Sequence, residues 1–98
     1  MRTLIKVVFD TETSNRMLAD GSLQQALQGF MSTVRPEAAY FAPTDGRRCA
    51  YLFADLPEEA ALVTSLEPFW QLNAHVTVTP CMNAEDLTTG LGRISDSG

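Results

Sequence analysis

The sequence contains few of the residues from which enzyme active sites are usually built. Its 98 residues include a single histidine, His75, a single tryptophan, Trp70, and two cysteines, Cys49 and Cys81. The glycines stand at predicted turns and helix ends, so they form no phosphate-binding loop and no dinucleotide-binding pattern. A Ser-His-Asp catalytic motif is absent as well. The sequence therefore has no catalytic or cofactor signature, and we expect no cofactor.

Positive charge is also scarce. Seven lysine and arginine side chains stand against twelve aspartates and glutamates, which gives a net charge of -5. No cluster of basic residues is larger than the pair Arg47-Arg48. Binding to nucleic acid or to an anionic membrane surface depends on clustered cations. We therefore expect neither nucleic acid nor membrane among the partners.

Long hydrophobic runs are missing too. The longest apolar run is far shorter than the roughly 20 residues that a membrane-spanning helix needs, and "MRTLIKVVFD" at 1–10 lacks the features of a secretory signal. We expect a soluble cytoplasmic protein with reduced cysteines. The length predicts one domain over 1–98, with a disordered tail at 93–98 and a core small enough for a second subunit to complete.

What the sequence does contain is a regular succession of strand and helix patterns. The predicted elements are a strand at 3–9, helices near 14–20 and 23–35, two strands around Asp45-Gly46, a helix after Asp55, a strand at 75–82 and a short helix from Asn83 to about Leu91. This order is typical of a ferredoxin-like α+β fold, βαββαβ. It predicts an antiparallel sheet of order 4-1-3-2 with the helices on one face, and an extra short C-terminal helix.

Turn-forming and helix-capping residues mark the boundaries of these elements. A two-residue turn at Asp45-Gly46 would place Tyr40 opposite Tyr51. Gly21 suits the left-handed position after a helix. Two capping patterns, Ser22 with Gln25 and Asp55 with Glu58, predict the starts of the two long helices, and Pro68 is expected to kink or end the second of them.

Alternation along the strands predicts one face of the sheet that no helix covers. If Val76 and Val78 face the helices, His75 and Thr77 lie on the open side. In the first strand Ile5, Val7 and Phe9 then face the helices. The predicted open face is half aromatic and half polar, as expected for an interface or a ligand groove. Its members are Leu4, Lys6, Val8, Tyr40, Tyr51, Phe53, His75, Thr77 and Thr79.

The strands "LIKVVF", "EAAYFAP", "RRCAYLF" and "HVTVTPCM", together with "DGSL" and "PEAAYF", resemble the dimeric α+β barrel proteins, and most closely their small uncharacterised bacterial members. The resemblance implies a homodimer in which two ferredoxin-like sheets pack open face to open face. This superfamily includes monooxygenases and isomerases. Haem-degrading members would be expected to show an asparagine on the first strand, where this chain has Lys6 and no asparagine, so no catalytic residue is carried over.

Two side chains on the open face are candidates for chemistry. A register that pairs Asp10 with His75, Val8 with Thr77 and Lys6 with Thr79 would set a carboxylate beside the imidazole, as a general base requires. The alternative is an exposed histidine at a strand end or at a dimer seam. Lys6 is a candidate for Schiff-base or anion-binding chemistry, or else it pairs across the interface or reaches solvent.

Metal binding is not predicted. His75 and Cys81 share a face, but six strand residues separate them by about 20 Å, which is too far for a common ion. Two functional hypotheses follow, and a third possibility is that the chain is a subunit of a hetero-oligomer. The first is a homodimeric binding or structural module. The second is a small cofactor-independent enzyme, resembling a monooxygenase or an isomerase, that binds a small organic molecule in a pocket lined by Lys6, Tyr40, Tyr51, Trp70, His75 and Thr77.

Overall fold

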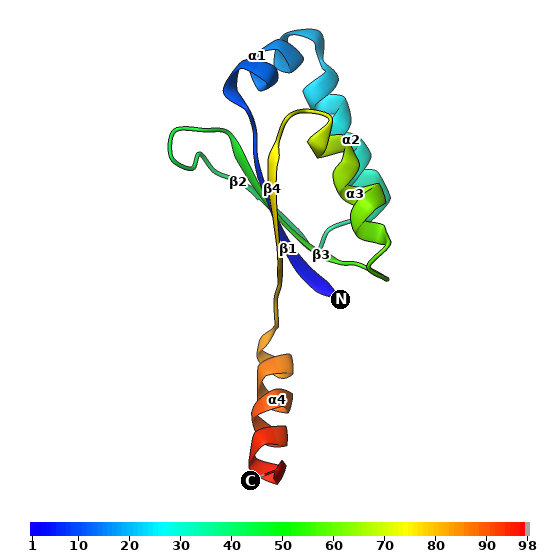
Figure 1. The fold of residues 1–98 in the computed structure, drawn as a ribbon, viewed down its shortest axis with the longest axis vertical. Coiled ribbons are helices and arrows are strands. Elements are labelled where there is room, and N and C mark those ends of the chain that lie inside the picture. Colours follow the sequence, from blue (N-terminus) through cyan, green and yellow to red (C-terminus); the bar gives the residue numbers. More distant parts are fainter. Residues whose placement is uncertain (98) are drawn as a thin grey trace.

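Four strands form a single antiparallel sheet in the computed structural model, which describes residues 1–97 (Figure 1). They are β1 (Arg2–Val8), β2 (Ala38–Phe41), β3 (Cys49–Asp55) and β4 (His75–Pro80). Their spatial order is β2-β3-β1-β4, which is the predicted order read from the other edge. Each pair of neighbours is antiparallel. The predicted α+β class and the sheet order are therefore confirmed.

Helices α2 (Ser22–Val34) and α3 (Ala61–Trp70) pack on one face of this sheet. Every second side chain of β1 points toward them, and Ile5 and Val7 have no solvent exposure. The intervening side chains of β1 are only half-buried, so the predicted assignment of the two faces is correct. The core joins residues of both layers: Ile5, Val7, Ala50 and Leu52 from the sheet, and Leu23, Phe30, Leu66 and Phe69 from the helices.

The hairpin between β2 and β3 has the predicted register. Tyr40 lies opposite Tyr51, and Ala38 lies opposite Phe53. Thr44 and Arg47 bridge across the turn, and the two residues between them have positive φ, 52° at Asp45 and 77° at Gly46. Two positive φ angles match the right-handed twist of the flanking strands, which is why an Asp-Gly pair closes tight hairpins.

Helix α1 (Thr11–Asp20) begins three residues before its predicted start near 14, because Asp10 caps it. Gly21 separates α1 from α2 in the left-handed conformation, with φ 82°, as predicted. The expected capping box of Ser22 and Gln25 is wrong, since α2 has no side-chain cap. Asp20 accepts hydrogen bonds from the backbone N–H and the hydroxyl of Ser22 instead.

The boundaries of α3 also differ from the prediction. The predicted cap of Asp55 with Glu58 is wrong, since Asp55 is the last residue of β3 and binds the Met1 amino group at 2.9 Å, and α3 begins at Ala61 with no side-chain cap. Pro68 lies inside α3 and does not end it. The turn after Pro68 is retained because Phe69 is fully buried, with its ring centroid 5.1 Å from that of Phe30 and 6.2 Å from that of Phe9.

The C-terminal helix α4 (Ala84–Ser97) projects away from the rest of the molecule, beyond the end of β4 (Figure 1). It continues to Ser97 instead of ending near Leu91, so residues 93–97 of the predicted disordered tail are helical, and residue 98 lies outside the described part. Its N-terminus was predicted correctly, since Asn83 caps it: the Asn83 side chain accepts from Asp86 N at 2.8 Å, and Asn83 N donates back to the Asp86 carboxylate.

Phe69 is the side chain whose truncation should damage this fold most. Phe69→Ala would leave a cavity between α2, α3 and β1, and we expect it to lower the free energy of unfolding by about 3–5 kcal/mol in urea titrations followed by circular dichroism. Val63→Ala on the exposed side of the same helix should change it by less than about 0.5 kcal/mol. Equal losses in the two variants would contradict this picture of the core.

Candidate functional site on the open face

The open face of the sheet is defined by Leu4, Lys6, Val8, Ala38, Tyr40, Tyr51, Phe53, His75, Thr77 and Thr79, which alternate along the four strands with residues that face the core. The register places one side chain from each strand in a single row. Tyr40 pairs with Tyr51, Tyr51 with Lys6, and Lys6 with Thr77. Four of the predicted site residues therefore lie side by side across the middle of the sheet.

Lys6 and Tyr51 form the centre of this row. The Lys6 ammonium lies over the Tyr51 ring, 5.9 Å from its centroid, which is the geometry of a cation–π contact. The Tyr51 hydroxyl shares a hydrogen bond of 2.7 Å with Thr44 Oγ1, which fixes the far end of the ring. Within residues 1–97 no carboxylate forms an ion pair with Lys6. The ammonium is thus placed and oriented, and it is open to an anion from outside the chain.

His75 lies on the open face, but its predicted partner does not. The register of β1 and β4 pairs Val8 with His75, Lys6 with Thr77 and Leu4 with Thr79. The predicted register, with Asp10 opposite His75, is therefore wrong by two residues. The displacement is an even number, so every side chain keeps its predicted face. The residue opposite His75 is the apolar Val8. The strand pairing therefore does not support the predicted contact between the Asp10 carboxylate and the His75 imidazole.

Asp10 caps the N-terminus of α1. Its carboxylate accepts hydrogen bonds from Thr13 N at 2.9 Å and from Thr13 Oγ1 at 2.8 Å. The Thr13 hydroxyl also accepts from the Asn73 side chain, which links α1 to the turn before β4. These hydrogen bonds from Thr13 hold the pKa of Asp10 below its usual value, and the bond from the backbone N–H has the largest effect. This carboxylate is the N-terminal cap of α1.

Trp70 is the other predicted site residue that lies away from the row. It is the last residue of α3, and α3 packs on the opposite side of the sheet. Its side chain is 45% exposed. The structure therefore brings together Lys6, Tyr40, Tyr51 and Thr77, keeps His75 on the same face, and separates Asp10 and Trp70 from them.

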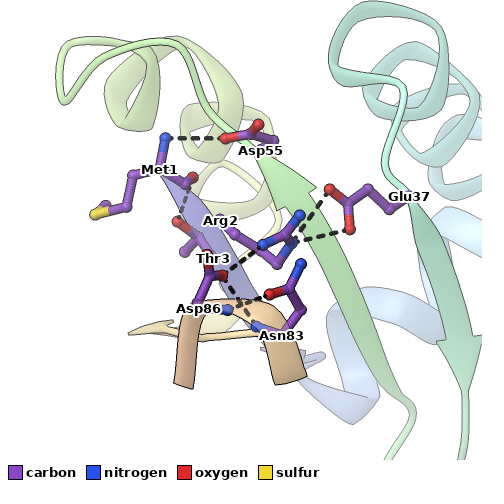
Figure 2. A network of polar contacts seen from close by, with 7 residues as sticks. All are labelled: Met1, Arg2, Thr3, Glu37, Asp55, Asn83 and Asp86. Carbon is purple, nitrogen blue, oxygen red and sulfur yellow. Dashed lines mark hydrogen bonds and ion pairs between the residues drawn. The ribbon is translucent and has the colours of Figure 1, made fainter. Parts of the chain in front are cut away.

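A polar network at one end of the open face was not foreseen from the sequence. Figure 2 shows Arg2 between two carboxylates, with Nε 3.2 Å from Glu37 and Nη1 3.0 Å from Asp86. The hydrogen bond to Glu37 and the charges of both carboxylates raise the Arg2 pKa. Alternation in the first strand places Arg2 on the open side with Leu4 and Lys6, but no local pattern indicates that Asp86, far along the chain, returns to it.

Three pockets of about 220 to 260 Å³ lie elsewhere on the molecule. The first lies between α2 and the β2–β3 hairpin, the second between α2 and α3, and the third near Pro57. None of these three includes Lys6, Tyr51, Thr77 or His75 in its lining.

Three further findings concern metals, membranes and the cysteines. In the described part of the chain, no three histidine, cysteine or acidic side chains lie close enough to hold a metal ion. Among the helices of residues 1–97, none is both long and apolar enough to cross a membrane. Cys49 and Cys81 are free thiols.

The cap at Asp10 gives a pH-dependent prediction. Because the folded state lowers the pKa of Asp10, its carboxylate stabilises the fold above the unfolded-state value near 3.8. This stabilisation is lost as the pH falls through the lower folded-state value. Asp10→Ala should reduce the melting temperature at neutral pH, and the difference from the unmodified protein should shrink below about pH 4. Asp10→Asn keeps an acceptor oxygen and should lose less. A pH-independent difference would contradict the prediction.

Comparison of this chain with models of protein families, with curated proteins and with solved structures finds no match. The resemblance to dimeric α+β barrel proteins therefore stays a prediction, and the function has to be argued from the geometry.

Proposed function

We propose that this chain is a homodimeric binding or structural module of the ferredoxin-like type, and that two copies associate through their open faces as in the dimeric α+β barrel proteins. The observation that carries the proposal is the composition of the open face. It presents Tyr40, Tyr51 and Phe53 beside Leu4 and Val8, on the side of the sheet opposite the core helices. An apolar surface of this kind is typical of an interface.

The size of the chain supports the same proposal. A domain of this length buries a smaller fraction of its surface than a larger one, and its core here occupies only one side of the sheet. Packing a second sheet on the open side would give β1 and β3 a buried environment on both faces. Two copies would then share one layer of side chains between their sheets, and apolar contacts would supply most of the association free energy.

Lys6 supports a second candidate function. Among the residues of the open face it is the one lysine, and the arginine at the end of the same face, Arg2, is already paired with Glu37 and Asp86. A second copy brings another Lys6 to the interface, and the carboxylates of Glu37 and Asp86 at the end of the face are already paired with Arg2. An organic anion between the two sheets would satisfy both ammonium groups, with Tyr51 and Thr77 beside it. Such an anion site would bind the substrate in the enzyme hypothesis, which is a cofactor-independent monooxygenase- or isomerase-like protein. His75 lies at the edge of this site.

Sedimentation equilibrium tests the dimer. We expect a particle with twice the 10.7 kDa mass of the chain. Tyr40→Asp places a charge in the proposed interface and should raise the dissociation constant at least about tenfold, because a buried unpaired carboxylate costs more than the 1.4 kcal/mol that a tenfold change represents. Val63→Asp is the matched control, since Val63 is 60% exposed and Tyr40 is 64% exposed, but Val63 lies on α3. A chain that stays monomeric at about 1 mM would contradict the proposal.

Nuclear magnetic resonance titration with benzoate, a small aromatic anion, tests the second candidate. We expect amide shifts that concentrate at Lys6, Tyr51 and Thr77, with binding in the millimolar range because a minimal probe makes few contacts. Lys6→Met keeps the length of the side chain and removes its charge, so it should weaken binding at least about tenfold. Shifts spread over the whole chain, or equal binding by Lys6→Met, would count against an anion site.

A further inference from the structure

The most apolar of the three pockets lies on the helix-covered side of the sheet, between α2 and the β2–β3 hairpin. It has a volume of about 240 Å³ and is lined mainly by apolar residues, among them Phe9, Leu23, Leu27 and Phe41. Phe9 and Leu23 belong to the core. The proposed dimer would use the other side of the sheet, so this pocket is accessible to a ligand whether or not a second copy binds.

Phe41 gives this pocket an apolar rim that meets water. Alternation along β2 places Phe41 on the same side as Ala39, which packs against the core. Phe41 is the last residue of its strand, however, and it is 58% exposed. Removing an aromatic ring of this kind from water is favourable. An apolar ligand in the pocket would therefore gain contact with Phe41 as well as with the core residues behind it.

Arg48 supplies the charge at this pocket. Among the described residues that line it, Arg48 alone is charged. Its Nη1 donates to Ser14 Oγ at 2.7 Å and to Asn15 Oδ1 at 2.8 Å, and both acceptors are neutral side chains of α1. Within residues 1–97 no carboxylate forms an ion pair with Arg48. The guanidinium is thus held in place by Nη1, which leaves Nε and Nη2, a pair that can bind a carboxylate through two parallel hydrogen bonds.

The acidic residue beside the pocket is already bound. Asp10 follows Phe9 in the chain, and its carboxylate accepts hydrogen bonds from Thr13. Those hydrogen bonds lower the pKa of Asp10, and the charges of Arg47 and Arg16 lower it further. Asp10 is therefore compensated by groups other than Arg48. The positive charge of Arg48 is the one that an anion in the pocket would meet.

The size of the pocket limits its occupant to a small molecule. An apolar cavity of about 150 Å³ binds benzene, and drug-sized ligands occupy clefts of roughly 300–1,000 Å³. The volume of about 240 Å³ lies between these values, so the pocket fits one ring or a branched chain with a short tail. A single guanidinium matches one carboxylate in charge and geometry. A phosphate dianion would keep uncompensated charge beside the apolar lining.

We propose that this pocket binds a small organic monocarboxylate with an aromatic or branched aliphatic body. The body lies among Phe9, Leu27 and Phe41, and the carboxylate binds Arg48. The apolar lining supplies most of the affinity, and Arg48 selects the acid over a neutral molecule of the same shape. This site is separate from the row around Lys6 on the open face, and it depends on neither the proposed dimer nor the proposed anion site there.

Nuclear magnetic resonance titration of the full chain with phenylpropionate tests the site, with the neutral phenylpropanol as the matched probe. We expect amide shifts that concentrate at Phe9, Leu27 and Phe41, with a dissociation constant in the millimolar range because the probe is small. The alcohol should bind at the same residues at least about fivefold more weakly. Shifts at Lys6, Tyr51 and Thr77 instead, or no saturable shift up to about 20 mM, would overturn the proposal.

Arg48→Gln separates charge recognition from binding of the apolar body. This variant should bind the acid at least about fivefold more weakly and leave the binding of the alcohol within about twofold, so the two probes become equivalent. Arg47→Gln is the matched control, since it makes the same change one residue earlier and outside the lining, and it should keep the preference for the acid. Equal losses in both variants would indicate only a general attraction of anions and would refute the role of Arg48.

A second substitution tests the apolar part of the site and does not depend on the fold of Arg48→Gln. Phe41 is exposed at the end of a strand, so Phe41→Ala should fold. It should weaken both probes at least about threefold and keep the preference for the acid, because the ring contact is lost and Arg48 remains. Unchanged binding of both probes in Phe41→Ala would show that they bind elsewhere and would overturn the proposal.

Discussion

The pairing of β1 with both of its neighbours is the constraint on which the rest of this structure depends. β1 lies in the middle of the sheet, with β3 on one side and β4 on the other. Its alternation places Ile5 and Val7 in the core and leaves Leu4, Lys6 and Val8 on the open face. A shift of one residue against β3 or β4 would exchange these two sets relative to that neighbour. The core and the candidate site are thus two consequences of one register.

Much of this arrangement can be predicted from the sequence, because short-range patterns determine it. The Asp45-Gly46 turn fixes the β2–β3 register, since a two-residue loop leaves no freedom in the pairing. The valines of β4 identify its buried face, so Thr77 and His75 could be placed on the open side. The pairing of Tyr40 with Tyr51 follows from the turn, whereas the pairing of Lys6 with Thr77 does not, because the predicted register paired Lys6 with Thr79.

What could not be predicted depends on contacts between distant parts of the chain. β1 and β4 are joined by no turn, and a displacement by two residues keeps every side chain on its face, so alternation could not distinguish Asp10 from Val8 as the neighbour of His75. The helix past Pro68 is retained because Phe69 packs between Phe9 and Phe30, and that packing is tertiary. The direction of α4 depends on the contact of Arg2 with Asp86, which are 84 residues apart.

The open face limits what chemistry the single chain can perform. Lysine and histidine side chains change their proton affinity strongly when they lose water or gain a nearby charge. Lys6 is half-buried and His75 is exposed, and His75 has Val8 opposite it. Only a surface that covers this face can remove water from the row around Lys6. In the proposed dimer, a reaction on this face would therefore follow assembly. For the same reason a ligand bound between two sheets would stabilise the dimer, because it would bind the assembled state more tightly than the separate chains.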